Sequence, residues 1–210
     1  MKFVMLVEGQ TEKDSIADFV RRGLHPRLQE RVGVSVVRFK GFGDYLSKIK
    51  DRVEIYLAGK HADEIIAAIG LIDLCGPQIF PAGLSPAQKA RWGKKELERQ
   101  VGHPRFRQYF AVHETEAWLL AHKEVLPEAV RESLPSQCSQ PETVNNNEPP
   151  SRLLGRLYQN RLNRPYRKVA DGKNLFLRCD PEVAASRCPH FKEFLTDLEQ
   201  MARAALQQNN

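Results

Sequence analysis

The sequence predicts an α/β fold, in which a mainly parallel sheet is covered by helices on both faces. Segments typical of strands and of helices alternate over about the first 120 residues. Residues 65–72 form a continuous apolar run, which is typical of a strand buried on both faces. Because strands that alternate with helices are joined by right-handed crossovers, the strands are expected to run parallel.

The expected elements follow in order along this part of the chain. Strands are predicted over residues 2–7, 32–39, 65–72 and 106–112. Helices are predicted after Thr11, which is placed to act as an N-cap, over the apolar stripe 46–57, from Ser85 to about Arg99, and over 114–121. Residues 41–43 include two glycines and predict a turn between the second strand and its helix.

The character of the chain changes after residue 126, so three parts are expected. Residues 1–126 form the α/β core, 127–150 a proline-rich loop or lid, and 151–210 a basic, helical C-terminal extension that packs on the core. Within the extension, helices are predicted over 151–160, after Asp180, and along the apolar stripe from Phe191 to Met201.

Composition excludes several classes of protein. With 210 residues, 41% hydrophobic and 28% charged, the chain is expected to form one globular domain with a modest appendage. No apolar run is long enough for a membrane span, and the N-terminal apolar stretch is too short for a signal peptide. The four cysteines are scattered without a C-x-x-C pair, which disfavours a disulfide-stapled secreted fold and a structural zinc site, so the predicted location is cytoplasmic.

The net charge of +6 is unevenly distributed. Residues 89–107 carry seven Lys or Arg against two acids, and residues 151–192 carry ten against three, so the rest of the chain is negative. This asymmetry favours a polyanion such as nucleic acid as a partner. Seven of the ten basic residues in the second segment are arginines, which suit bidentate phosphate binding. Charge alone leaves a solvated basic surface as the alternative.

Carboxylates follow three of the four predicted strands. Glu8 follows the first strand, Asp73 the third, and Glu114 and Glu116 the fourth. In a parallel sheet these positions share the carboxyl edge, where open α/β folds build their sites. Converging carboxylates repel one another unless a cation lies between them, and hard oxygen ligands select Mg²⁺ or Mn²⁺. Each acid taken singly also suits a helix N-terminus, and the spacing leaves open which of Glu114 and Glu116 faces the metal.

Four motifs in order along the chain resemble a bacterial TOPRIM-like family, and more broadly the TOPRIM fold of primases, topoisomerases and several nucleases. They are V-E-G-x-T-E at 7–12, an aspartate with a nearby glycine at 73–76, H-E-x-E-A-W-L-L at 113–120, and P-S-R-L-L at 150–154 before C-P-H-F at 188–191. The resemblance implies that Glu8 is a general acid/base or ligand and that Asp73 is the principal metal ligand. Where the TOPRIM pattern has a second aspartate this chain has Cys75, and a thiol is a poor ligand for Mg²⁺. Either Glu114 or Glu116 substitutes for it, or the site binds metal weakly.

These features together predict a Mg²⁺- or Mn²⁺-dependent TOPRIM-like nuclease that hydrolyses phosphodiesters of DNA or RNA. The predicted site comprises catalytic residues (Glu8, Asp73 and Glu116), metal ligands (Glu8, Asp73 and Glu114) and supporting residues (Glu12 and His113). The predicted contacts to nucleic acid come from the basic extension, at Arg152, Arg156, Arg167 and Lys168. The resemblance further implies an effector of anti-phage defence that works with an ATPase of the ABC/AAA type.

Two other functions compete with the nuclease. A non-catalytic TOPRIM-like module that binds nucleic acid or a partner ATPase is favoured by Cys75 at the position of the second aspartate. A phosphotransferase or phosphatase acting on a small phosphorylated substrate is the third hypothesis, and the lack of a glycine-rich phosphate loop weakens an NTPase version of it.

Overall fold

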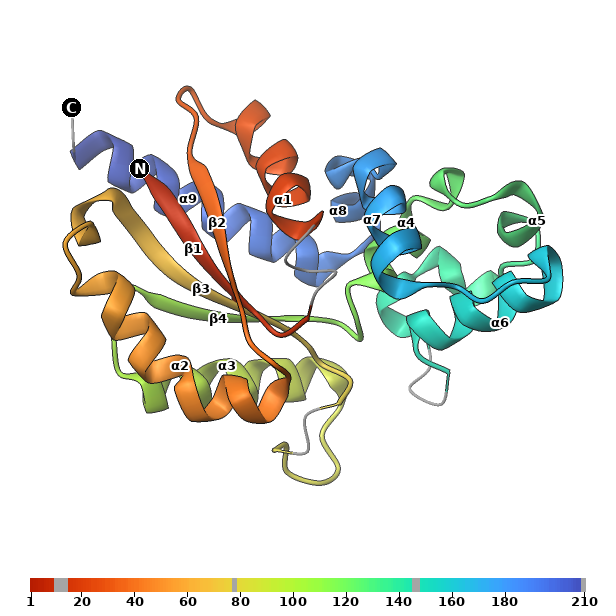
Figure 1. The fold of residues 1–210 in the computed structure, drawn as a ribbon, viewed down its shortest axis with the longest axis horizontal. Coiled ribbons are helices and arrows are strands. Elements are labelled where there is room, and N and C mark those ends of the chain that lie inside the picture. Colours follow the sequence, from red (N-terminus) through yellow and green to blue (C-terminus); the bar gives the residue numbers. More distant parts are fainter. Residues whose placement is uncertain (10–14, 77–78, 145–147, 209–210) are drawn as a thin grey trace.

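A parallel sheet lies between two layers of helices in the computed structural model, which describes residues 1–9, 15–76, 79–144 and 148–208 (Figure 1). Within these residues the sheet has four strands, β1 (Lys2–Val7), β2 (Gly33–Arg38), β3 (Ile65–Asp73) and β4 (Phe106–Ala111). Their order is β2-β1-β3-β4, and every neighbouring pair is parallel. The predicted α/β class is confirmed, and each predicted strand end lies within one residue of the observed one.

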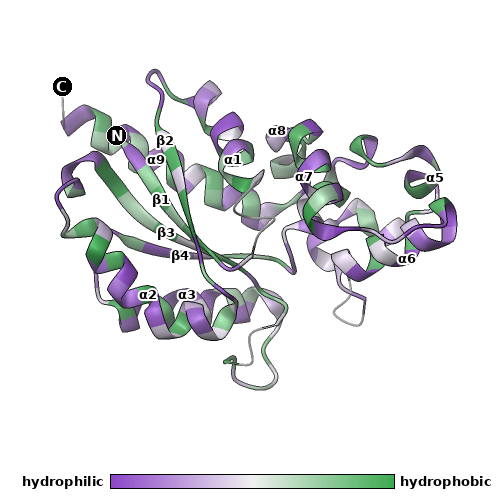
Figure 2. Cartoon of the chain, viewed as in Figure 1, coloured by the Kyte–Doolittle hydropathy of each residue, from purple (hydrophilic) through white to green (hydrophobic). Residues whose placement is uncertain are grey.

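Alternate residues of the central strand β1 face opposite helical layers. Phe3, Met5 and Val7 belong to a core cluster that includes residues of α1 (Ala17–Leu24) and α9 (Pro189–Gln208). Val4 and Leu6 belong to a second cluster with α2 (Phe42–Leu57) and α3 (Pro86–Val101). The neighbouring strand β3 is buried along its whole length until the half-buried Asp73, and Figure 2 shows both central strands as predominantly apolar. Two buried faces explain why these strands read as continuous apolar runs.

The start of α3 follows the local capping chemistry that the sequence predicts. The Ser85 hydroxyl accepts from the Gln88 amide at 3.4 Å, and the Gln88 side chain accepts from the Ser85 amide at 2.9 Å, which forms a capping box at α3. The helix after β4, α4 (Glu116–Ala121), begins two residues later than predicted. The predicted cap of the first helix, Thr11, lies outside the described residues.

The C-terminal half is helical and extends past the carboxyl edge of the sheet (Figure 1). It contains α5 (Glu128–Arg131), α6 (Pro150–Leu162), α7 (Lys168–Arg178) and α8 (Pro181–Arg187), followed by α9, which returns along the sheet. The segment predicted as a loop or lid holds α5 and two 3₁₀ turns, Ser136–Ser139 and Pro141–Thr143. Three of its buried side chains, Val130, Cys138 and Val144, join the core cluster that contains Phe3, Met5 and Val7 of β1. Helix α7 was not predicted. None of the described helices combines the length and apolarity that crossing a membrane requires.

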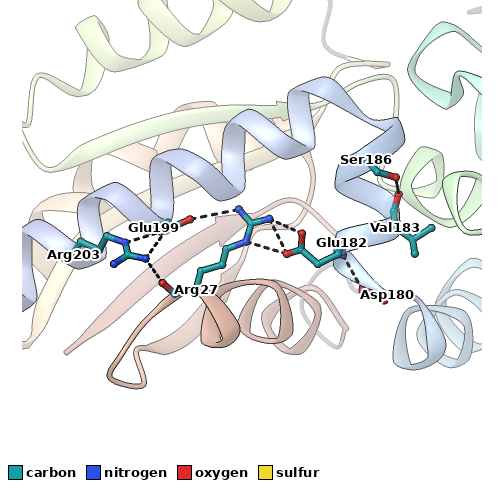
Figure 3. Close-up of polar contacts among 7 residues, drawn as sticks. All are labelled: Arg27, Asp180, Glu182, Val183, Ser186, Glu199 and Arg203. Atoms are coloured by element: carbon teal, nitrogen blue, oxygen red, sulfur yellow. Dashed lines mark hydrogen bonds and ion pairs between the residues drawn. The ribbon is translucent and has the colours of Figure 1, made fainter.

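Arg27 fastens the end of the first helical segment to the two last helices (Figure 3). Its guanidinium donates to Glu182 of α8 at 2.7 Å and lies 3.5 Å from Glu199 of α9, while its carbonyl accepts from Arg203. Together with the shared core cluster, these contacts hold the C-terminal helices against the sheet.

Candidate functional site

Asp73 ends β3 at the carboxyl edge of the sheet, as predicted. It is the register partner of Ala111, the last residue of β4, so the turn that follows β4 begins beside it. One oxygen of Asp73, Oδ1, accepts from the Thr115 amide at 3.0 Å, and the Cys75 amide donates to the His113 carbonyl at 2.9 Å. These bonds fix the turn after β4 against the end of β3.

Glu116 is the first residue of α4, and its side chain is fully buried. Burying an ionised carboxylate costs several kcal/mol unless a cation or hydrogen-bond donors compensate it. Lys168 supplies that cation: its Nζ lies 3.2 Å from Glu116 Oε2 and 3.4 Å from Asp73 Oδ2. Two carboxylates from different strand ends therefore share one ammonium group, which comes from the first residue of α7. We call Asp73, Glu116 and Lys168 the acid site.

Glu114 points to a different partner. Its Oε2 accepts from the Ser151 amide at 2.7 Å and its Oε1 from the Ser151 hydroxyl at 2.9 Å. Ser151 lies in the first turn of α6, so the Glu114 carboxylate compensates the positive end of that helix. The sequence left open which of the two glutamates points toward Asp73. In the structure Glu116 faces Asp73 and Lys168, and Glu114 binds the start of α6.

Glu8 follows Val7, whose register partner on β3 is Leu71, and it is half-buried at the same edge of the sheet. Glu12 lies outside the described residues. Within residues that the structure does describe, no group of three or more His, Cys, Asp or Glu side chains is placed to hold a metal ion. The assignment of Glu8, Asp73 and Glu114 as metal ligands stays a prediction, and the carboxylates seen to share a cation are those of Asp73 and Glu116.

Cys75, where the TOPRIM-like resemblance predicts a second aspartate, is half-buried two residues after Asp73. Burial, and after it the negative charges of Glu114 and Asp73, raise the pKa of its thiol to about 11. The thiol is therefore protonated near neutral pH, and in that form it does not bind a hard cation.

The four basic residues predicted to contact nucleic acid have different surroundings. Arg152 is exposed on α6. Arg156 is bonded to Glu148 through Nη2 at 2.9 Å, and Arg167 lies 4.0 Å from Asp171, so acids partly offset both charges. Lys168 belongs to the acid site.

His113, predicted as a supporting residue, is almost fully buried, and its backbone carbonyl accepts from Cys75. Two participants near the acid site were not predicted. Thr115 contributes its backbone amide to Asp73, which no side-chain pattern reveals. Tyr166 lies close enough to Glu116 for that carboxylate, after burial itself, to raise the pKa of its phenol, which keeps the hydroxyl protonated.

Comparisons with solved structures find chains to which this one is similar. The C-terminal region of the OLD protein from Burkholderia pseudomallei has 17% identity and a TM-score of 0.47, over 94% of this chain and 98% of that chain. The C-terminal region of the OLD protein from Xanthomonas campestris pv. campestris has 18% identity and a TM-score of 0.41, over 96% of each chain. No curated protein matches the sequence. The family described as a domain of unknown function, DUF4276, matches residues 7–199, and the chain belongs to that family.

Proposed function

We propose that this chain is a divalent-metal-dependent phosphodiesterase that acts on nucleic acid. The observation that carries the proposal is the meeting of Asp73 and Glu116 at one cation, the Lys168 ammonium, at the carboxyl edge of the sheet. That edge is where open α/β folds place their ligands.

The donor set of the acid site fits Mg²⁺ or Mn²⁺. Both prefer carboxylate oxygens, and Mg²⁺ is commonly held by one or two carboxylates, with water and substrate phosphate completing its shell. Asp73 and Glu116 would hold the ion. It would supply polarisation of the scissile phosphate and a lowered pKa of attacking water.

The chain's own groups contribute positioning and charge. The Thr115 amide orients the Asp73 carboxylate. Lys168 brings a positive charge that can pair with a phosphate, because its side chain is 38% exposed beside the buried Glu116. Arg152, exposed on α6, extends the positive surface along which a phosphate backbone can lie. Glu8 keeps the acid/base role that the TOPRIM-like resemblance implies.

The same resemblance supplies the finer part of the proposal. On the basis of this resemblance, we propose that the chain is an effector of anti-phage defence and works with an ATPase of the ABC/AAA type. DNA and RNA remain equal candidates as substrate, since phosphate contacts do not distinguish them.

A non-catalytic nucleic-acid- or ATPase-binding module is the second candidate, and one observation favours it. The second aspartate of the TOPRIM pattern is replaced by Cys75, whose raised thiol pKa keeps it from acting as a hard-metal ligand. Without a ligand at position 75, only Asp73, Glu116 and water would be left to coordinate the metal ion.

A cleavage assay separates the two candidates. Purified protein is incubated with labelled single-stranded DNA, double-stranded DNA and tRNA in Mg²⁺ and in Mn²⁺. The nuclease predicts cleavage that falls on the order of 10²–10³-fold or more in Asp73→Asn, in Glu116→Gln and in Glu8→Gln. The control is Glu124→Gln, an exposed glutamate on the 3₁₀ turn Lys123–Val125, which should cleave as the wild type does.

Two outcomes would count against the nuclease. Cleavage that survives both the Asp73 and the Glu116 substitutions would exclude the acid site as the centre of reaction. Salt-sensitive binding of nucleic acid without cleavage in either metal would establish the binding module in its place.

A further inference from the structure

A second feature of this part of the molecule is a cavity of about 880 Å³, which is lined in part by the turn that follows β4. It lies between the start of α3, the end of β4, the 3₁₀ turns of residues 136–143 and the junction of α8 and α9. His113 lines it and lies two residues before Thr115, whose amide holds Asp73. The cavity and the acid site therefore share the turn that follows β4, while Asp73, Glu116 and Lys168 are not among the described residues that line the cavity.

The cavity is lined by the guanidinium of Arg187, by one carboxylate and by His190, whose imidazole is bonded to that carboxylate. The acid, Glu142, is already engaged: its oxygens accept from the amides of His190 and Phe191 at 3.1 and 3.3 Å, and from His190 Nδ1 at 2.8 Å. The hydrogen bond to Glu142 raises the pKa of His190, so the imidazolium is favoured. Arg187 donates from Nη1 to the Ala121 carbonyl at 2.9 Å, which anchors a guanidinium that has five N–H donors in all. The cavity is thus suited to an anion.

The rest of the lining suits a flat ring. Ala87 and Val112 are apolar parts of the lining, and the hydroxyls of Thr143 and Ser186, which already donate to the carbonyls of Gln140 and Val183, are acceptors in it. Binding pockets for small molecules are typically about 300–1,000 Å³, mostly apolar, with a few placed polar groups. A ring with polar edges attached to an anionic group matches this combination of apolar side chains, hydroxyls and cations.

We propose that this cavity binds one nucleotide of the substrate, with the base against the apolar parts of the lining and a phosphate against Arg187 and His190. The choice of a nucleotide over other anionic ring compounds rests on the proposed function. The cavity would then position the nucleic acid so that a neighbouring phosphate reaches the acid site, and it would sense the base as well as the backbone.

Binding of adenosine 5′-monophosphate (AMP) to the whole chain tests this proposal by calorimetry in EDTA. AMP is expected to bind saturably at one site. Adenosine and inorganic phosphate, tested separately, are each expected to bind at least about tenfold more weakly, because each lacks one half of the contacts. Phosphate that binds as tightly as AMP would overturn the role of the base, and absence of AMP binding would overturn the site.

Variants of the lining residues test whether AMP binds in the cavity. Ala87→Trp fills the space and Arg187→Gln removes a cation, and each is expected to weaken AMP binding at least about tenfold. Arg187→Lys keeps the charge and should retain more of the affinity than Arg187→Gln. Arg161→Gln, at an exposed position of α6, is the matched control and should bind AMP as the wild type does. Unchanged binding in both Ala87→Trp and Arg187→Gln would overturn the proposal, and Arg187→Gln carries the test if Ala87→Trp does not fold.

The result is separable from that of the cleavage assay, because EDTA removes the metal. AMP binding that is lost in Ala87→Trp upholds the cavity even where nucleic acid is not cleaved, and only the proposed function then fails. Cleavage by a protein that does not bind AMP upholds the acid site and overturns the cavity.

Discussion

Glu116 and Glu142 are both buried carboxylates at the carboxyl edge of the sheet, with side chains 0% and 7% exposed, but their partners differ. Glu142 accepts from two backbone amides at the start of α9 and from the His190 imidazole. Glu116 is paired with the ammonium of Lys168, whose side chain is 38% exposed.

The difference separates a structural carboxylate from one that is suited to chemistry. Backbone amides hold fixed positions in a helix, so the bonds from His190 and Phe191 tie Glu142, in the turn Pro141–Thr143, to the start of α9. A lysine sits on a flexible four-carbon stem and can exchange its place with another cation or turn to a phosphate. We therefore expect that Glu116 can exchange Lys168 for another cation without loss of the fold.

The largest effect on stability is expected at Glu142. Glu142→Gln removes charge-assisted bonds to the α9 terminus and should lower the free energy of unfolding by about 1–3 kcal/mol. Glu116→Gln should change it by less than about 1 kcal/mol, because a neutral amide relieves the desolvation of a buried charge and Lys168 still pairs with Asp73. Urea denaturation of both variants measures this, and a larger loss in Glu116→Gln than in Glu142→Gln would reverse the comparison.

A smaller effect is expected at Glu114, which resembles Glu142 in binding a helix start. Ser151→Ala removes the hydroxyl bond to Glu114 but leaves the amide bond at 2.7 Å, so the expected loss is about 1 kcal/mol. Ser136→Ala, at an exposed position, is the control. A loss in Ser151→Ala no greater than that of the control would show that Glu114 is not fastened to α6 in solution.

The smallest effect is a pH dependence at the Glu142–His190 pair. The hydrogen bond to Glu142 raises the pKa of His190 in the folded protein, so the pair's contribution is fully present below the unfolded pKa of about 6.5 and is lost as pH rises through the folded pKa. The imidazole is one-third exposed, which limits this contribution to at most about 1 kcal/mol. Comparison of the wild type with His190→Asn in urea should give a stability difference that shrinks from pH 6 to pH 9. A difference that grows with pH would contradict the pairing.

The two central strands of the sheet could be predicted from the sequence because a strand that is buried on both faces is apolar at nearly every residue. The run 65–72 and the apolar stretch 2–7 have alternate side chains in two different core clusters, and both strands were predicted within one residue. Helix α7 was missed because its N-cap position, Arg167, makes no side-chain cap and Gly172 interrupts the helix pattern.

The site could be located only in part for a different reason. Asp73 and the turn after β4 are placed by strand ends, which the sequence predicts. The contact between Lys168 and Asp73 joins residues 95 positions apart and depends on where α7 begins. Which of Glu114 and Glu116 faces Asp73 likewise depends on where α6 begins. Its first turn lies beside Glu114, because the Ser151 hydroxyl donates to the Glu114 carboxylate. Periodicity and spacing carry no information on either placement.

Binding of Mn²⁺, followed by electron paramagnetic resonance, tests most directly whether Asp73 and Glu116 form one cation site. The wild type and Glu142→Gln are expected to bind one ion, and the double variant Asp73→Asn/Glu116→Gln to lose it. Lys168→Met should bind the ion at least as tightly as the wild type, because the competing ammonium is gone. Wild-type affinity in the double variant would contradict a shared cation site at Asp73 and Glu116.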